Sequence, residues 1–205
     1  MASTEAPALD AGAHIADPGP LGLAGFASTT LILSLVNAGV VGSGTEISAV
    51  VALAFFYGGL AQLLAGMWEF RKGNTFGATA FPTFGAFWIA FASFVVFFAP
   101  SVPKAEAATA TGMFLLVFLI VTAYLTVAAL RTNAALLGVF VLLTLTYLFL
   151  VLAELGGVES LGKVGGWLGV ATAIVAFYTS FAGVVNATWK RVVLPVYPLA
   201  PTARS

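Results

Sequence analysis

Uncharged polar side chains recur at helical spacing inside stretches of sequence that are otherwise apolar. Thr30, Ser34 and Asn37 follow Phe26 at steps of four, four and three residues, so the four side chains share one face of a helix. Further polar groups of this kind are Gln62, Thr83, Thr144, Tyr147 and Asn186. Ser and Thr hydroxyls can bond to their own helix. A carboxamide at membrane depth instead needs a partner on another helix or a polar passage, and for Asn37 and Gln62 both interpretations stay open.

Acidic side chains are rare in these stretches, and Glu69 is the one whose chemistry needs testing. An acid within a membrane-spanning helix is by default a candidate functional residue, for example a proton relay. Glu69 also stands close in sequence to Arg71 and Lys72, so a surface ion pair at the membrane interface is the simpler alternative.

The residue combinations on which catalysis usually depends are missing from the sequence. His14 is the only histidine and lies near the start of the chain, so a single chain cannot build a His-based metal site or a Ser-His-Asp triad. Cysteine is absent, which excludes disulfides and thiolate chemistry. No glycine-rich phosphate loop follows a strand pattern. We therefore expect neither an enzyme nor a bound cofactor or metal.

Six apolar runs must position the polar groups. They are residues 22–42, 48–68, 76–99, 111–130, 134–153 and 165–187. Each run holds about 20 residues or more, which is the length of helix that crosses a hydrocarbon core of about 30 Å. The sequence therefore predicts an all-α, polytopic membrane protein with six transmembrane helices.

The composition agrees with a protein that works inside the lipid bilayer. Apolar residues make up 60% of the chain and charged residues 8%, whereas about a quarter of the residues of a soluble domain are charged. The formal net charge is zero. There is thus no electrostatic reason to expect nucleic acid as a partner.

The basic residues indicate how the chain is oriented in the membrane. We expect a flexible cytoplasmic N-terminal segment (1–19), a six-helix transmembrane domain (20–189) and a cytoplasmic C-terminal tail (190–205). Six spans place both termini on the same side, and six of the eight basic residues fall on that side. Because basic residues near the ends of membrane helices stay in the cytoplasm, both termini are expected to be cytoplasmic.

Two of the predicted helices carry faces suited to packing. Small residues recur at steps of three and four in the last run, namely Gly169, Ala173, Ala176, Ser180, Gly183 and Ala187. Such a stripe lets another helix approach closely. The third run instead carries a series of aromatic side chains, Phe84, Phe87, Trp88, Phe91, Phe94, Phe97 and Phe98. We expect most of these aromatic side chains to face lipid or a neighbouring subunit.

Two stretches of the sequence resemble a known family. Asp17-Pro-Gly-Pro-Leu-Gly-Leu23, followed by Gly25-Phe26, is similar to the signature that opens the first helix of the acetate uptake transporters, the succinate–acetate permease group. Phe56-Tyr57-Gly58-Gly59 resembles the start of the family's most distinctive block, which continues here through Gln62, Gly66, Glu69 and Lys72-Gly73-Asn74 to Phe87-Trp88. The resemblance extends over all six runs.

This resemblance implies a homohexamer of six-helix protomers, each with its own central pathway narrowed by three side chains. By position in the motifs, Phe26 and Leu143 take two of the three places in this constriction. Phe84 takes the place where the family has Tyr, so a hydroxyl is missing at the narrowest point. Asp17 stands where the family usually has Asn, and either residue can cap a helix.

The resemblance further implies a small carboxylate as substrate. A carboxyl group titrates at about pH 4 to 5, as the side chains of Asp and Glu do, so acetate is mostly an anion at neutral pH. Moving this anion against a membrane potential costs about 2.3 kcal/mol per 100 mV. An accompanying proton cancels this cost. We therefore expect proton-linked uptake of acetate, or a gated acetate channel, with the dicarboxylate succinate and small monocarboxylates other than acetate as further substrates. A channel for formate or ammonia, and a membrane sensor subunit that moves no substrate, are the alternatives.

Overall fold

The computed structural model describes residues 15–42 and 45–199. Most of the N-terminal segment predicted for residues 1–19, His14 included, lies outside the described residues, as do residues 200–205 of the predicted tail. Within the described ranges, six helices are long and apolar enough to cross a membrane. This confirms the all-α membrane fold that the six apolar runs predicted.

The helices follow the apolar runs with shifted ends. They are α1 (Gly19–Asn37); α2 (Thr45–Phe55), which continues through the π-helical η1 (Phe56–Ala61) into α3 (Gln62–Lys72); α4 (Thr75–Ser93), which continues through η2 (Phe94–Phe98) and η3 (Ala99–Ser101); α5 (Ala107–Ala129); α6 (Ala134–Gly156); and α7 (Glu159–Trp189). The connection predicted for residues 154–164 is much shorter than expected. Gly157 adopts the left-handed conformation (φ 66°), which ends α6 at once and lets α7 begin two residues later.

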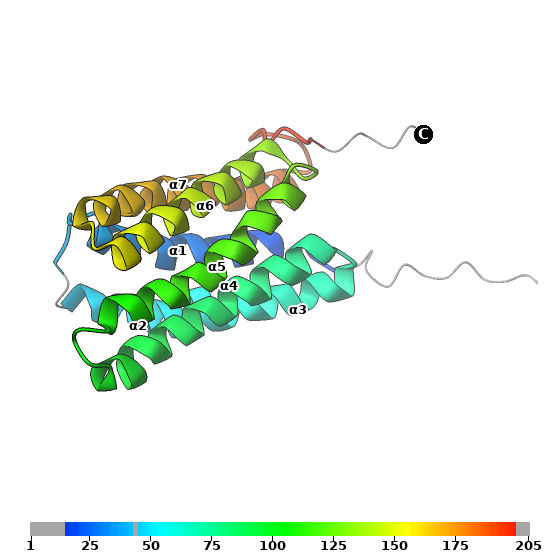
Figure 1. Ribbon diagram of the computed structural model, residues 1–205. Helices are drawn as coiled ribbons and strands as arrows, with labels where there is room; N and C mark the ends of the chain where they lie inside the picture. Colours follow the sequence, from blue (N-terminus) through cyan, green and yellow to red (C-terminus); the bar gives the residue numbers. More distant parts are fainter. Residues whose placement is uncertain (1–14, 43–44, 200–205) are drawn as a thin grey trace, which may run out of the picture.

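The helices form two groups joined along α1 and α5. α7 packs against α1 and α6, α5 packs against α6, and α3 packs against α4 (Figure 1). η1 and α3 also contact α1, which brings the two groups together. The start of α1 and the segment after α7 lie at the same end of the bundle (Figure 1). We call this the terminal end and the other the opposite end.

The stripe of small residues on α7 packs against α1 within the same chain. A Cβ atom added at Gly169 would overlap the hydroxyl of Ser34 on α1. Closer to the terminal end, the Ser180 hydroxyl donates a hydrogen bond of 2.6 Å to the carbonyl oxygen of Pro20. Close approach of the two backbones is what small residues permit between helices in lipid, so the predicted role of the stripe is confirmed.

The aromatic series on the third predicted helix does not behave as expected. Phe84, Phe87 and Trp88 are only 3%, 3% and 2% exposed, because α4 is covered there by α1, α3 and α5. Phe97 and Phe98, beyond the end of α4, are exposed. The expectation that most of the series faces lipid or another subunit is therefore wrong for the three residues that prove to be core.

The C-terminal segment folds back onto the start of α6. The Ala134 amide donates to the carbonyl oxygen of Tyr197 at 2.8 Å, and the Leu199 amide donates to that of Thr132 at 2.9 Å. The Asn186 side chain holds the same segment through hydrogen bonds with the backbone of Val193 and Leu194. Residues 190–199 thus form an ordered cover over the terminal end of α6.

Candidate functional site

Two cavities, both lined by described residues, lie toward opposite ends of the bundle. The terminal cavity has a volume of about 340 Å³ and is lined by the first turns of α1, α4 and α6, by both ends of α3 and by the last turns of α7. The opposite cavity has a volume of about 110 Å³ and is lined by the second halves of α1 and α6, the last turns of α4 and the start of α5. Along α1, α4 and α6, one cavity follows the other, so together they trace a path through the bundle.

Phe26 and Leu143 line both cavities and therefore separate them. Each of these side chains is 4% exposed and points into the bundle. Phe84 lines the terminal cavity, with its ring centroid 5.7 Å from that of Phe26. Phe140 lies 6.0 Å from Phe84 on the side of α6. The structure thus brings together the three residues expected at the constriction and adds Phe140, which sequence reasoning missed.

The polar face predicted on α1 lines the opposite cavity. Thr30, Ser34 and Asn37 all contribute to its wall, and Tyr147 of α6 lines the same cavity. The Tyr147 ring packs edge-on against Phe87, with centroids 5.6 Å apart. The spacing along the first helix therefore predicted correctly which of its side chains share a surface.

Two residues that line the opposite cavity carry hydrogen-bond donors without an acceptor in the described part of the chain. The Thr30 hydroxyl and the Trp88 indole N–H are buried, and neither has a hydrogen-bond partner among the described residues. Both residues line the opposite cavity. Buried polar atoms without partners are rare in folded proteins, and here two of them belong to residues of neighbouring helices, Thr30 on α1 and Trp88 on α4. The aromatic series in the sequence predicts only a packing role for Trp88.

The terminal cavity contains two carboxamides from the predicted set. Gln62 is 1% exposed, and its Oε1 has no hydrogen-bond partner within residues 15–42 and 45–199. Asn186 also lines the cavity, but its Oδ1 accepts from the amides of Val193 and Leu194 at 2.7 and 3.0 Å. The Gln62 oxygen thus has no partner among the described residues, whereas the Asn186 side chain serves to hold the C-terminal segment.

Thr83 and Thr144 line neither cavity. The Thr144 hydroxyl donates to the Phe140 carbonyl oxygen at 2.9 Å and lies 2.7 Å from the Thr126 hydroxyl of α5. This pair joins α5 to α6. Thr83 lies on α4 away from both cavities. The structure therefore does not bring these two residues to the others predicted along the pathway.

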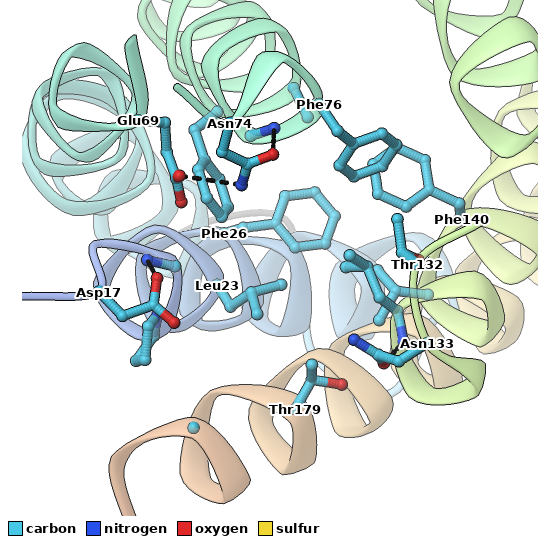
Figure 2. Close-up of a pocket in the computed structure, with 18 of the residues that line it drawn as sticks. Asp17, Leu23, Phe26, Glu69, Asn74, Phe76, Thr132, Asn133, Phe140 and Thr179 are labelled. Carbon is cyan, nitrogen blue, oxygen red and sulfur yellow. Dashed lines mark hydrogen bonds between the residues drawn. The ribbon is translucent and has the colours of Figure 1, made fainter. Parts of the chain in front are cut away.

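Glu69 is buried beside the terminal cavity and forms no ion pair with its basic neighbours. Only 1% of the residue is exposed, and its Oε2 accepts a hydrogen bond of 2.9 Å from Asn74 Nδ2. Asn74 in turn caps α4, because its Oδ1 accepts from the Gly77 amide at 3.2 Å (Figure 2). Lys72 pairs with Asp17 instead. The alternative interpretation of Glu69, a surface ion pair, is therefore wrong.

Charge is confined to the outer parts of the two cavities. Among the described residues, Asp17, Glu69 and Lys72 line the terminal cavity and Glu154 lines the opposite one. The section between them is built from aromatic and aliphatic side chains. An apolar constriction of this kind opposes hydrated ions, while polar groups on both sides can bind a small solute that has an apolar part.

A family model described as the GPR1/FUN34/yaaH family matches residues 5–201. The chain is 39% identical over 190 residues to Ammonia transport outward protein 2 of Saccharomyces cerevisiae, covering 90% of this chain and 66% of the yeast protein. It is 33% identical over 182 residues to the succinate-acetate/proton symporter SatP of Escherichia coli, covering 89% of this chain and 95% of that protein. The chain therefore spans about two thirds of the yeast relative and nearly all of the bacterial one.

A solved structure is similar to this chain as well. The fold is similar to that of the bacterial acetate channel SatP, with a TM-score of 0.83 and 33% sequence identity. The match covers 89% of this chain and 99% of that structure. The likeness therefore extends over most of this chain and nearly all of that structure.

Proposed function

Because the chain belongs to the GPR1/FUN34/yaaH family, we propose that it transports acetate across a membrane through the interior of its own six-helix bundle. One observation carries this proposal. Two cavities from opposite ends of the bundle both reach Phe26 and Leu143, so a small movement of these side chains joins them. The bacterial relatives are named for acetate and succinate, and the chemistry of the cavities suits a small carboxylate.

The three residues at the constriction select for a small solute with an apolar part. Phe26, Phe84 and Leu143 present only carbon to the passage, so a methyl group crosses without losing hydrogen bonds. A hydrated inorganic ion would have to lose its bound water at the constriction, where these three side chains have no polar group to replace that water. This desolvation costs much free energy. Acetate meets this requirement better than chloride, because only one end of it is charged.

Uncharged groups on both sides of the constriction hold the carboxylate. Thr30 and Trp88 supply donors in the opposite cavity, with Ser34, Asn37 and Tyr147 alongside, and Gln62 supplies a carboxamide in the terminal cavity. Neutral donors bind an anion more weakly than a fixed cation does. Conduction needs such moderate binding, since the solute must also leave.

Proton-linked uptake gives Glu69 a role as relay. Its carboxyl group is buried, lines the terminal cavity and is held by Asn74. A proton that moves with acetate cancels the electrical cost of about 2.3 kcal/mol per 100 mV that the anion alone would meet. A carboxyl group next to the passage can take that proton from the solute and release it toward the terminal end.

The protomers assemble as a homohexamer in which each carries its own pathway. Large apolar side chains on the outside of the bundle, among them Phe56, Leu60 and Trp68, support a protein surrounded by lipid and by copies of itself. The terminal end faces the cytoplasm, because six of the eight basic residues belong to that side. Residues 20–189 form the transport domain, and the terminal segments 1–19 and 190–205 are cytoplasmic.

Uptake of labelled acetate by proteoliposomes containing the purified protein tests this function. We expect uptake above that of empty liposomes, with competition by unlabelled acetate and succinate and none by chloride. Binding of acetate without uptake would favour a sensor instead. Uptake of methylammonium, unaffected by acetate, would point to the solute for which the yeast relative is named.

A further inference from the structure

Asp17 and Lys72 form an ion pair at the mouth of the terminal cavity. Lys72 Nζ lies 2.8 Å from Asp17 Oδ1, and both residues line the cavity. Their side chains are 32% and 53% exposed, which places the pair where the cavity opens to water. The pair therefore lies on the route of any solute that uses this cavity.

The pair is built from segments far apart in the sequence. Asp17 precedes α1, and its Oδ1 also accepts a hydrogen bond of 3.1 Å from the Gly19 amide. Lys72 is the last residue of α3, which ends at Gly73 in the left-handed conformation (φ 76°). The positions of Lys72 and Asp17 are thus set by two helix ends. As a result, the Lys72 ammonium group is paired with the Asp17 carboxylate and is not left unpaired in the solvent.

We propose that Asp17 sets the preference of this protein for monocarboxylates over dicarboxylates, because its carboxylate neutralises the charge of Lys72 at the mouth of the terminal cavity. This inference rests on the proposed transport function. A free ammonium group would attract every anion, and a dianion twice as strongly as a monoanion. With Asp17 paired to it, Lys72 contributes little net charge. The remaining charged residue of the described cavity wall is Glu69, which is itself acidic.

The size of the effect follows from the charge of the substrate. A unit charge about 7 Å away in water changes the occupancy of the cavity mouth by a singly charged solute about threefold. Succinate carries two ionised carboxylates at pH 7.5, so removing the Asp17 charge raises its occupancy about ninefold by the same arithmetic. The uptake ratio of succinate to acetate should thus rise about threefold. Salt reduces this gain, because the screening length falls from about 10 Å at 0.1 M to about 3 Å at 1 M.

The Asp17→Asn variant removes the charge and retains the fold. Asn Oδ1 can still accept the hydrogen bond from Gly19, so the start of α1 is preserved. We expect the ratio of initial succinate to acetate uptake into proteoliposomes, at low ionic strength and subsaturating substrate, to rise about threefold in this variant. Lys72→Gln should change the ratio in the opposite direction. The double variant should return it close to that of the unsubstituted protein.

A matched control removes an equal charge elsewhere. Glu159→Gln breaks the exposed Glu159–Lys163 pair, and neither residue lines the terminal or the opposite cavity, so the uptake ratio should not change. Acetate uptake by the unsubstituted protein together with an unchanged ratio in both Asp17→Asn and Lys72→Gln would overturn this inference and leave the transport function intact. A lack of acetate uptake by the unsubstituted protein would overturn both.

Discussion

The rings of Phe26 on α1 and Phe84 on α4 lie 5.7 Å apart between centroids and are tilted by 58°. Phe84 reaches on to Phe140 of α6 at 6.0 Å, so three helices contribute aromatic rings to one layer across the bundle. This layer closes the terminal cavity on its inner side. Because it offers no polar group to a passing carboxylate, it is the place where a single added hydroxyl should have the largest effect.

Phe84→Tyr should raise the rate of acetate uptake. The new hydroxyl gives the carboxylate a partner in the apolar layer, and a hydrogen bond is worth about 0.5–1.5 kcal/mol net, or about two- to tenfold. Initial rates of labelled acetate uptake by proteoliposomes measure the change. Phe76→Tyr is the control, since Phe76 lines only the terminal cavity, packs on Phe140 and is not one of the three residues expected at the constriction. Identical kinetics for Phe84→Tyr and the unsubstituted protein would place Phe84 outside the pathway.

Phe26→Ala and Leu143→Ala should admit larger acids. Each substitution widens the section between the cavities, so uptake of butyrate relative to acetate should rise several-fold. Truncating a buried side chain costs about 2–5 kcal/mol of stability, so the amount of folded protein must be measured for each variant.

The control for these two variants is Leu152→Ala, which shortens an exposed side chain on the same helix as Leu143. Its ratio of butyrate to acetate uptake should match that of the unsubstituted protein. If the ratio also stays constant in Phe26→Ala and Leu143→Ala, the constriction lies elsewhere.

Thr30→Val should weaken acetate uptake without weakening the fold. The hydroxyl has no hydrogen-bond partner in the described part of the chain, so stability should not fall. Losing a hydrogen bond to a charged group costs about 1.5 kcal/mol or more, which raises the acetate concentration for half-maximal uptake about tenfold. Trp88→Phe should act in the same direction.

Thr122→Val is the matched control for Thr30→Val. Thr122 is equally buried, but its hydroxyl donates to the Phe118 carbonyl oxygen at 2.6 Å and the residue lines neither cavity. Its half-maximal acetate concentration should not change. An unchanged value for Thr30→Val and Trp88→Phe as well would remove the opposite cavity from the binding of acetate.

Glu69→Gln should separate proton movement from acetate movement. A Gln oxygen can still accept the hydrogen bond from Asn74, so the local geometry is preserved, but the side chain no longer carries a proton. With a pH-sensitive dye inside the liposomes, we expect fewer protons per acetate in this variant. The same number of protons per acetate in both proteins would mean that the proton travels on the substrate and that Glu69 is structural.

Local patterns predicted most of the fold and part of the site. Helical spacing was sufficient to place Thr30, Ser34 and Asn37 on one cavity wall, because the period of a helix fixes which side chains share a face. The same reasoning failed for Thr144, whose hydroxyl lies next to Thr126 of α5. A hydroxyl on an apolar helix has the same pattern whether it faces a cavity or a neighbouring helix.

The contacts that sequence reasoning missed join segments distant along the chain. Asp17 and Lys72 are 55 residues apart, and no periodicity relates the start of one helix to the end of another. Trp88 belongs to an aromatic series whose members look alike in sequence. Yet Trp88, within α4, is buried, whereas Phe98, beyond the end of α4, is exposed. Only the packing of α1, α3 and α5 around α4 distinguishes them.

Chemical modification of one introduced cysteine tests most directly whether acetate passes between the two cavities. The chain contains no cysteine, so Leu143→Cys and the control Leu152→Cys each provide a single reactive thiol. After complete reaction with N-ethylmaleimide, checked by mass spectrometry, acetate uptake should be lost in the Leu143→Cys protein and kept in the Leu152→Cys protein. Full acetate uptake by completely modified Leu143→Cys would contradict a pathway through the bundle at Phe26 and Leu143.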